Sequence, residues 1–330
     1  MKLGFVLGQM TYLRYFIPLV IEANKRGLDC VFFHIESHKY NSPHKHKKSL
    51  EKLCKDYNFI LLPFEDLKEF EGIVFMMEGI GIDSVKKENK KIVLNYMRDF
   101  NVHYDKYVNK ADYIILPSKF FADHYKKHSD KNLYLGTPKY DVEFNKEEIF
   151  KKYNIATNKN ALIVFPTLSH LSTKYGIKNI KFIDIYKFLH KMGYNVMVKA
   201  RGKEPAPNEL RGDNYFEDFS WFPHDTMELI KICDIVISFD SGVSKECVML
   251  DTPFINYHII ISNVFSFSFL YNNYRYCVNL ESNVDFEEFS NIVNRLTTED
   301  LTEEFKRSRK NHLFEANDVS KQILDVLKIC

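Results

Sequence analysis

The sequence predicts an α/β protein built from two doubly wound, Rossmann-like domains. Short runs of β-branched and aromatic residues alternate with longer runs of helical period, which is typical of parallel strands joined by crossover helices. This alternation breaks in a charged stretch and restarts at residue 161. At 330 residues the chain also exceeds the usual size of a single hydrophobic core.

The strands of the first series are expected at 2–8, 29–35, 59–64, 72–78, 113–117 and 132–138. Those of the second series are expected at 161–167, 194–200, 214–219, 233–239, 252–258 and 275–280. The break between them predicts an N-terminal domain of residues 1–150 and a C-terminal domain of residues 151–330. The tail from residue 298 is helical in period, and Asp318 or Ser320 is expected to cap a last helix.

Composition excludes several classes of protein. The formal net charge of +2 argues against a protein that coats nucleic acid. The six cysteines include no CxxC pair, so no zinc site or redox dithiol is indicated and a reducing compartment fits best. No run of 18 or so apolar residues is present to span a bilayer. We expect a cytoplasmic protein with at most peripheral membrane association.

The best candidate site is the turn within "CDIVISFDSGVSKECVMLDTPFIN", residues 233–256. In open α/β sheets ligands bind beyond the carboxyl ends of the strands. The turn follows a buried strand and comprises Asp240, Ser241, Gly242, Val243 and Ser244. Gly242 is expected to allow close approach of a diphosphate, which the hydroxyls and the N–H groups of the next helix would hold. Glu246 suits either ribose hydroxyls or a helix-capping role.

Other strand ends of the second half supply further candidates. Lys199 and Arg201 lie two residues apart after one strand, a spacing that suits a pyrophosphate. Trp221 and Phe222 suit one wall of a nucleobase pocket or a packed aromatic loop. A turn after the first strand of this half offers polar groups for phosphate, for an acceptor or for helix capping; its residues are Thr167, Ser169 and His170.

In the first half, two strand ends carry polar residues suited to an acceptor. Glu78 follows one strand and is the first candidate for the catalytic base, with His170 the second. The turn after the first strand is the expected acceptor side, through Gly8, Gln9, Thr11 and Tyr12.

Missing motifs narrow the chemistry. The sequence lacks GxxxxGK[ST], a Gly-rich dinucleotide fingerprint, GxSxG and HExxH, so kinase-like, NAD-dependent and common hydrolase functions are not indicated. It also lacks an Asp-x-Asp pair of the kind that holds a metal-bound nucleotide. We therefore expect neither a metal nor a cofactor.

The segments "KADYIILPSKFFADHY", "LYLGTPKYD" and "CDIVISFDSGVSKECVMLDTPFIN" resemble the GT-B superfamily. That superfamily includes nucleotide-sugar glycosyltransferases, hydrolysing UDP-N-acetylglucosamine 2-epimerases and CDP-glycerol glycerophosphotransferases. The resemblance implies two domains facing across a cleft, a donor nucleotide on the second domain and a final helix that crosses back to the first. It also implies that Asp240–Ser244, Glu246, Lys199 and Arg201 lie near the donor.

Departures from its members rank the alternatives. The first turn reads "GQMTY" where the epimerases have Gly-Thr-Arg-Pro-Glu, and the His-Gly-Thr-Pro and Pro-Thr-Trp-Arg motifs of the glycerophosphotransferases are absent. We therefore expect a metal-independent glycosyltransferase that moves a sugar from a nucleotide-diphosphate donor to a glycan or small hydroxyl acceptor, in surface-glycan or capsule synthesis. The alternatives are an epimerase, a CDP-glycerol-type phosphotransferase and a non-catalytic nucleotide-sugar binding protein.

Overall fold

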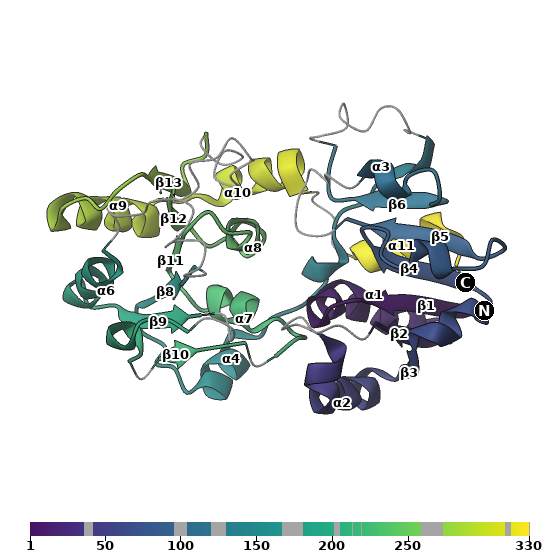
Figure 1. Cartoon of the computed structure of the whole chain (residues 1–330). Coiled ribbons are helices and arrows are strands. Elements are labelled where there is room, and N and C mark those ends of the chain that lie inside the picture. Colours follow the sequence, from purple (N-terminus) through teal and green to yellow (C-terminus); the bar gives the residue numbers. More distant parts are fainter. Residues whose placement is uncertain are drawn as a thin grey trace. The chain divides into compact units, whose positions relative to one another are not determined.

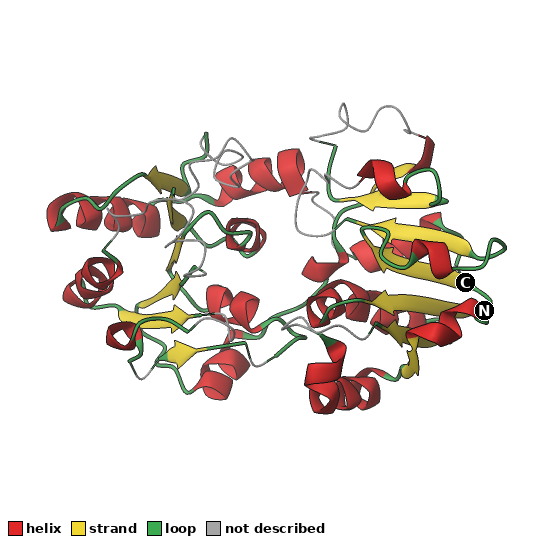
Figure 2. Cartoon of the chain, in the orientation of Figure 1, coloured by secondary structure: helices red, strands yellow, loops and turns green. Residues whose placement is uncertain are grey.

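The computed structural model describes residues 1–35, 42–95, 104–119, 130–166, 181–200, 205–212, 214–218, 220–258, 273–313 and 318–329. The chain divides into two compact units. Unit 1 comprises Met1–Val142 and Lys310–Cys330, and unit 2 comprises Glu143–Arg309. In each unit the helices flank a sheet of strands (Figures 1 and 2).

The sheet of unit 1 is parallel, with the strand order β3-β2-β1-β4-β5-β6-β7 among the described residues. Its strands are β1 (Lys2–Leu7), β2 (Asp29–His34), β3 (Ile60–Pro63), β4 (Ile73–Met77), β5 (Lys90–Leu94), β6 (Tyr113–Leu116) and β7 (Asn132–Tyr134). The expectation of a doubly wound parallel sheet is confirmed. The expected strands all form, but β5 was not predicted, because it begins with two lysines and buries only its last three residues.

The helices of unit 1 include α1 (Leu13–Lys25), α2 (Lys47–Tyr57), α3 (Tyr104–Tyr107) and α11 (Val319–Val326). The apolar face of α1 packs on the sheet through aromatic rings. Phe16 lies with its ring centroid 5.3 Å from Phe5 and 6.0 Å from Phe32. These rings are fully buried, so they anchor the start of α1 directly after β1.

The tail helix α11 begins on a carboxylate from a distant part of unit 1. Asp141 accepts hydrogen bonds from the backbone N–H groups of Val319 (2.9 Å) and Ser320 (2.5 Å). Asp318 precedes α11 with its backbone in the left-handed conformation (φ 64°). Among the described residues, its side chain makes no capping hydrogen bond to this helix. The expected cap by Asp318 or Ser320 is therefore wrong, because Asp141 satisfies the first amides instead.

The sheet of unit 2 is also parallel, with the order β10-β9-β8-β11-β12-β13 among the described residues. Its strands are β8 (Asn160–Val164), β9 (Asn195–Lys199), β10 (Tyr215–Phe216), β11 (Ile235–Ser238), β12 (Phe254–Tyr257) and β13 (Cys277–Leu280). Each of these strands lies within its expected range except β8, which begins one residue before it. The strand order reverses between β8 and β11, at the centre of the sheet.

The helices of unit 2 are α4 (Lys146–Tyr153), α6 (Phe182–Lys191), α7 (Asp225–Lys231), α8 (Val243–Met249), α9 (Phe286–Thr298) and α10 (Thr302–Ser308), as far as this unit is described. Tyr153 and Lys152 of α4 each lie 2.6 Å from a carboxylate oxygen of Glu228 on α7. These contacts tie α4 to unit 2, so the first segment of unit 1 ends at Val142, before the boundary expected at residue 150, and the tail Lys310–Cys330 forms its second segment.

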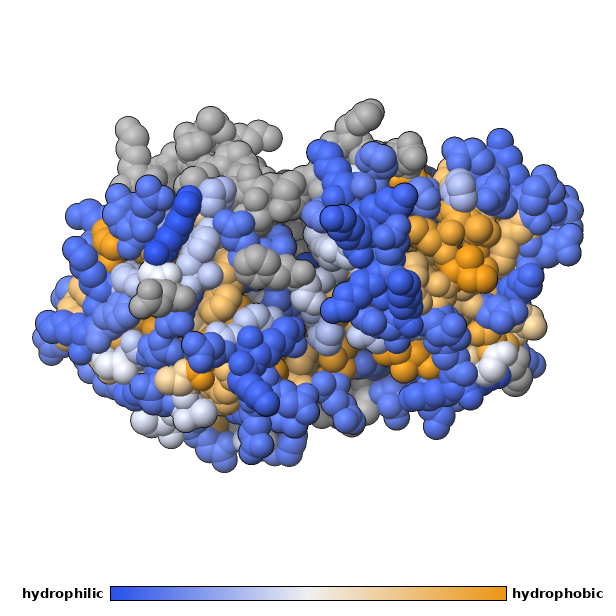
Figure 3. Space-filling view, turned by 90° about the horizontal axis from the view of Figure 1, so that it is seen from below, coloured by the Kyte–Doolittle hydropathy of each residue, from blue (hydrophilic) through white to orange (hydrophobic). Residues whose placement is uncertain are grey.

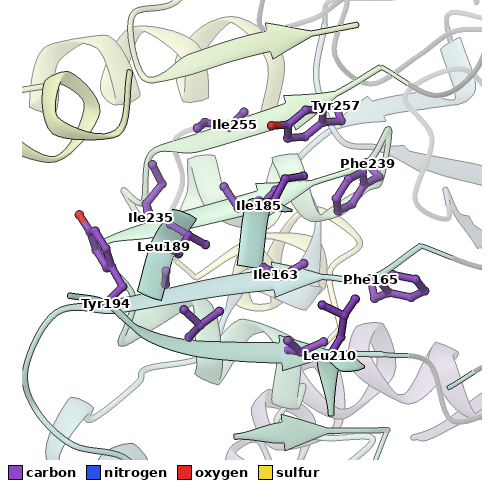
Figure 4. Close-up of a cluster of buried hydrophobic side chains, with 14 of the residues drawn as sticks. Ile163, Phe165, Ile185, Leu189, Tyr194, Leu210, Ile235, Phe239, Ile255 and Tyr257 are labelled. Atoms are coloured by element: carbon purple, nitrogen blue, oxygen red, sulfur yellow. The ribbon is translucent and has the colours of Figure 1, made fainter. Parts of the chain in front are cut away.

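The core of unit 2 lies between the sheet and the helices α6 and α9. Figure 4 shows Ile163, Ile235 and Ile255 on neighbouring strands beside Ile185 and Leu189 of α6. All five side chains are at most 1% exposed. A core packed this closely fixes the carboxyl ends of the strands, where the candidate site lies.

Apolar side chains gather on part of the surface of unit 1. Figure 3 shows apolar side chains gathered at the right of the view, on the side where unit 1 is drawn in Figure 1. Ile60, at the start of the edge strand β3, is 60% exposed. Among the described residues, no helix has both the length and the apolar character needed to cross a membrane.

Candidate functional site

The candidate donor turn follows β11 at the carboxyl edge of the unit 2 sheet. β11 is fully buried and pairs with both β8 and β12, so the turn lies where the strand order reverses. Such a reversal separates the loops of neighbouring strands and is the usual ligand position in an open α/β sheet. The structure thus places Asp240–Ser244 at the edge that the sequence analysis selected.

The backbone of this turn differs from the expected one. Asp240 takes the left-handed conformation, with φ 43°, whereas Gly242 has an ordinary helical φ of −58°. Aspartate tolerates the left-handed region better than most residues. The sharp change of direction therefore depends on Asp240, and the backbone conformation at Gly242 does not require glycine.

The serines of the turn make local hydrogen bonds. The Ser244 hydroxyl donates to the Ser241 carbonyl over 2.9 Å, and the Ser241 hydroxyl accepts from the Val243 N–H over 3.4 Å. Ser244 is 1% exposed and Val243 is 8% exposed, while Ser241 and Gly242 are partly exposed. Ser241 and Gly242 are thus the turn residues that present surface to a ligand.

The Asp240 side chain is fixed by a polar network across three strand ends. Its carboxylate accepts from Asn256 Nδ2 over 3.2 Å, and its backbone N–H donates to Asn256 Oδ1 over 2.8 Å. Asn256 Nδ2 also donates to Asn279 Oδ1 over 3.0 Å. His258 Nδ1 lies 3.0 Å from Asp240 Oδ2. The network holds the turn against β12 and β13.

Glu246 lies on α8 against the residue that precedes α7. Its Oε1 is 3.4 Å from His224 Nδ1, and the two side chains are 5% and 7% exposed. Trp221 and Phe222, in the loop just before His224, are 5% and 7% exposed. The structure thus brings Glu246 close to the loop that contains Trp221 and Phe222, although these side chains are packed rather than open.

Lys199 occupies a different environment from the one expected. Its side chain is 3% exposed, and its ammonium lies 2.7 Å from Asp218 and 3.9 Å from Asp225. Asp225 also lies 3.6 Å from His224, whose ring contacts Glu246. Lys199 therefore belongs to a cluster of charged side chains that extends through Asp225 and His224 to Glu246. Its ammonium pairs with carboxylates instead of facing a diphosphate.

In unit 1 the structure brings the two expected acceptor segments together. Gly8–Tyr12 follows β1, and Glu78 follows β4, which pairs with β1. A Cβ atom added to Gly8 would lie 3.3 Å from Tyr12 and 3.4 Å from Ile80, which shows how closely the segments pack. Thr11 and Tyr12 are 7% and 2% exposed, and Gln9 accepts a turn hydrogen bond from Tyr12. Glu78 is partly buried, with φ 49°.

Four expected site residues lie outside the described residues: Thr167, Ser169, His170 and Arg201. Their assigned roles stay predictions. Within the described ranges, no group of three or more His, Cys, Asp or Glu side chains is arranged to hold a metal ion.

The site residues predicted from the sequence do not include His258, His224, Asn256 or the two aspartates that pair with Lys199. Asn256 is the next-to-last residue of β12 and His258 directly follows this strand, so the same reasoning from strand ends applies to both residues. A buried Asn on each of two paired strands is a further signal, because Asn256 and Asn279 are register partners. Asp218 carried no sequence signal, and Asp225 suggested only a cap for the next helix.

The fold is similar to solved structures of the GT-B superfamily, which confirms the expected fold. The UDP-N-acetylglucosamine 2-epimerase of Methanocaldococcus jannaschii, in complex with UDP-GlcNAc and UDP, matches with a TM-score of 0.64, 13% identity and 100% coverage of both chains. The wall teichoic acid polymerase TagF, as an H444N variant with CDPG, matches with a TM-score of 0.66 and 14% identity, over 99% of this chain and 88% of that one. The glycotransferase of kitacinnamycin matches with a TM-score of 0.59 and 10% identity, over 99% and 98% of the two chains.

At the level of sequence, no curated protein shows significant similarity to the chain. A family model nevertheless matches residues 67–321, which is most of the chain and includes β11, the Asp240–Ser244 turn and Glu246. The family and the structural neighbours indicate a transferase. The chain belongs to the family of CDP-glycerol:poly(glycerophosphate) glycerophosphotransferases.

Proposed function

We propose that this protein transfers glycerol phosphate from a CDP-glycerol-type donor to a hydroxyl acceptor and releases CMP. The family match over residues 67–321 is the observation that carries this proposal. It favours a function that the sequence motifs alone ranked below sugar transfer. In such a reaction the acceptor oxygen attacks the phosphorus that bears glycerol, and the bond to the CMP oxygen breaks.

The carboxyl edge of the unit 2 sheet supports a nucleotide-diphosphate donor. The turn at Asp240–Ser244 lies where the strand order reverses, and its partly exposed residues, Ser241 and Gly242, suit contact with phosphate. Glu246 lies on the next helix, where its carboxylate suits the two hydroxyls of a ribose. In this proposal Arg201 contacts the diphosphate, whereas Lys199 stabilises the wall behind Glu246.

Stabilisation of the departing phosphate is then the main catalytic task. In many enzymes, preorganised hydrogen-bond donors that stabilise the charge developing in the transition state make the largest contribution to the rate. The absence of an Asp-x-Asp pair in the sequence supports our proposal that the protein needs no metal for this task.

Sugar transfer is the second candidate, on one specific observation. The His-Gly-Thr-Pro and Pro-Thr-Trp-Arg motifs that the resemblance associates with glycerophosphotransferases are absent from the sequence. A glycosyltransferase with the same donor edge would release a nucleoside diphosphate rather than CMP. Both candidates fit a role in surface-glycan or capsule synthesis.

A thermal-shift panel with product analysis tests the proposal. A ligand that binds only the folded state raises its melting temperature by mass action. We expect CDP-glycerol to raise the Tm of the purified chain more than UDP-N-acetylglucosamine or a GDP-sugar does. Release of UDP and N-acetylmannosamine from UDP-N-acetylglucosamine without an acceptor would instead indicate an epimerase. Binding without turnover on any acceptor would indicate a non-catalytic binding protein.

A further inference from the structure

An aspartate and a histidine form a dyad at the carboxyl edge of the unit 2 sheet. His258 directly follows β12, and its Nδ1 lies 3.0 Å from Asp240 Oδ2 and 3.2 Å from Asp240 Oδ1. The Asp240 side chain is 0% exposed, whereas the His258 side chain is 35% exposed. The pair therefore joins a buried carboxylate to an imidazole that reaches the surface.

The carboxylate of this dyad is held from a second direction. Asn256 donates to Asp240 Oδ1 and accepts from the Asp240 N–H, and it is fixed in turn by Asn279. The His258 N–H donates to the Leu280 carbonyl over 2.7 Å, which fixes the backbone under the ring. A side chain whose supporting groups are locked in this way keeps its orientation when a ligand binds.

The contact at Nδ1 decides what the other nitrogen can do. A neutral imidazole that donates from Nδ1–H to a carboxylate has an unshared electron pair on Nε2, which can accept a proton. A buried carboxylate at Nδ1 also stabilises the imidazolium that forms after proton transfer, as in other carboxylate–histidine pairs. The accessible part of His258 thus has the chemistry of a general base.

We propose that His258 is a catalytic residue and acts as the general base, with Asp240 as its positioning residue. This inference rests on the proposed transfer of glycerol phosphate. Nε2 accepts the proton of the acceptor hydroxyl as the acceptor oxygen bonds to the phosphorus that bears glycerol. The bond from that phosphorus to the CMP oxygen breaks, and its electron pair leaves with CMP. The proton then passes from His258 to solvent.

The location of the dyad suits this role. Asp240 is also the first residue of the proposed donor turn, so the imidazole and the diphosphate share one rigid support. A general base must lie within hydrogen-bond reach of the proton that it removes. His224, another described histidine of unit 2 near this turn, is only 7% exposed and its ring faces Glu246, so it is less suited to meet an acceptor.

Two substitutions separate the functions of the two ring nitrogens. In His258→Asn the amide nitrogen lies near the position of Nδ1 and keeps a donor for Asp240, but nothing replaces Nε2. In His258→Gln the amide reaches the position of Nε2 and can hydrogen-bond a phosphate or hydroxyl, but it cannot accept a proton. His190, an exposed residue of α6, provides matched controls as His190→Asn and His190→Gln.

The test measures kcat, donor affinity and melting temperature for the full chain and these four variants, with CDP-glycerol and an acceptor. We expect both His258 variants to lose about 10²- to 10⁴-fold in kcat, which is the usual contribution of a general base. Their affinity for CDP-glycerol and their Tm should stay at the wild-type values, and the His190 variants should match the wild type throughout.

Four results would overturn the assignment. Wild-type kcat in His258→Asn would show that only the bond to Asp240 matters. Weak donor binding in His258→Asn, restored in His258→Gln, would show a phosphate contact instead of a base. A wild-type protein that neither binds nor turns over CDP-glycerol would contradict the proposed function and this step of it, whereas normal turnover with unaffected variants would contradict the dyad alone.

Discussion

The ammonium of Lys199 lies 2.7 Å from a carboxylate oxygen of Asp218, with only 3% of the Lys199 side chain exposed. The same ammonium lies 3.9 Å from a carboxylate oxygen of Asp225, whose side chain is 1% exposed. We expect Lys199→Met to lower the free energy of unfolding by about 3 kcal/mol, because it leaves the buried carboxylate of Asp225 and the partly buried one of Asp218 without their counter-charge. Urea unfolding, followed with a spectroscopic signal from unit 2, measures this loss.

The control for this prediction is Lys187→Met, on an exposed position of α6. It should change stability by less than about 0.5 kcal/mol. If Lys199→Met kept wild-type stability and lost donor affinity alone, Lys199 would be a ligand contact, and its placement behind the site would be wrong.

Glu246 is expected to hold the ribose of the donor. Hydrogen bonds to charged groups contribute about 1.5–3 kcal/mol, so Glu246→Gln should weaken nucleotide binding about 10- to 100-fold. Isothermal titration calorimetry with CDP and with a ribose-free cytosine phosphonate measures the change. The variant should bind the ribose-free ligand as the wild type does, whereas Glu287→Gln, exposed on α9, should leave both affinities unchanged. Equal losses for both ligands would argue against the ribose contact.

The loop that presents Glu78 depends on the glycine that follows it. Gly79 has φ 73°, and a Cβ added there would lie 2.5 Å from the Cβ atom of Tyr107. Gly27 is a matched control, because its φ is 70° but a Cβ there meets nothing within 4 Å. Gly27→Ala should cost about 1 kcal/mol from backbone strain alone, and Gly79→Ala about 1–3 kcal/mol more from overpacking. Equal costs in thermal unfolding would show that the loop moves freely away from Tyr107.

Buried tyrosines make unit 2 sensitive to alkali. Burial raises the pKa of Tyr153, Tyr257 and Tyr276, and the hydrogen bond to Glu228 raises the pKa of Tyr153 further. Since the folded-state pKa lies above the unfolded value of about 10, the native state holds these protons longer. Their stabilisation is complete below pH ~10 and is lost as the pH rises further, with up to about 1.4 kcal/mol per pH unit from each group.

Urea unfolding at pH 8 to 11 measures this decline. Tyr257→Phe should show a shallower fall of stability with pH than the wild type, because one titrating group is removed. An unchanged slope would mean that Tyr257 ionises at the same pH in the folded and the unfolded chain.

The strands were the most predictable part of the fold, since parallel strands buried on both faces are continuous apolar runs such as Ile235–Ser238. The turn after that strand was predictable as a candidate site, because ligands bind beyond the carboxyl ends of the strands in open α/β sheets. Contacts between residues distant in sequence could not be predicted. Asp141 caps a helix whose first residue lies 178 positions further along the chain, and Asp218 pairs with Lys199, 19 positions before it. Only the folded register of β12 and β13 shows that Asn256, Asn279 and Asp240 form one network.

The central claim is that this protein transfers glycerol phosphate from CDP-glycerol to a hydroxyl. Phosphorus-31 NMR of CDP-glycerol incubated with the purified chain and a panel of polyol and glycan acceptors tests it directly. We expect loss of both diphosphate resonances and the appearance of CMP and a new phosphodiester, about 10²- to 10⁴-fold more slowly in the His258 variants. Intact CDP-glycerol, together with release of a nucleoside diphosphate from a nucleotide sugar in the same assay, would contradict it.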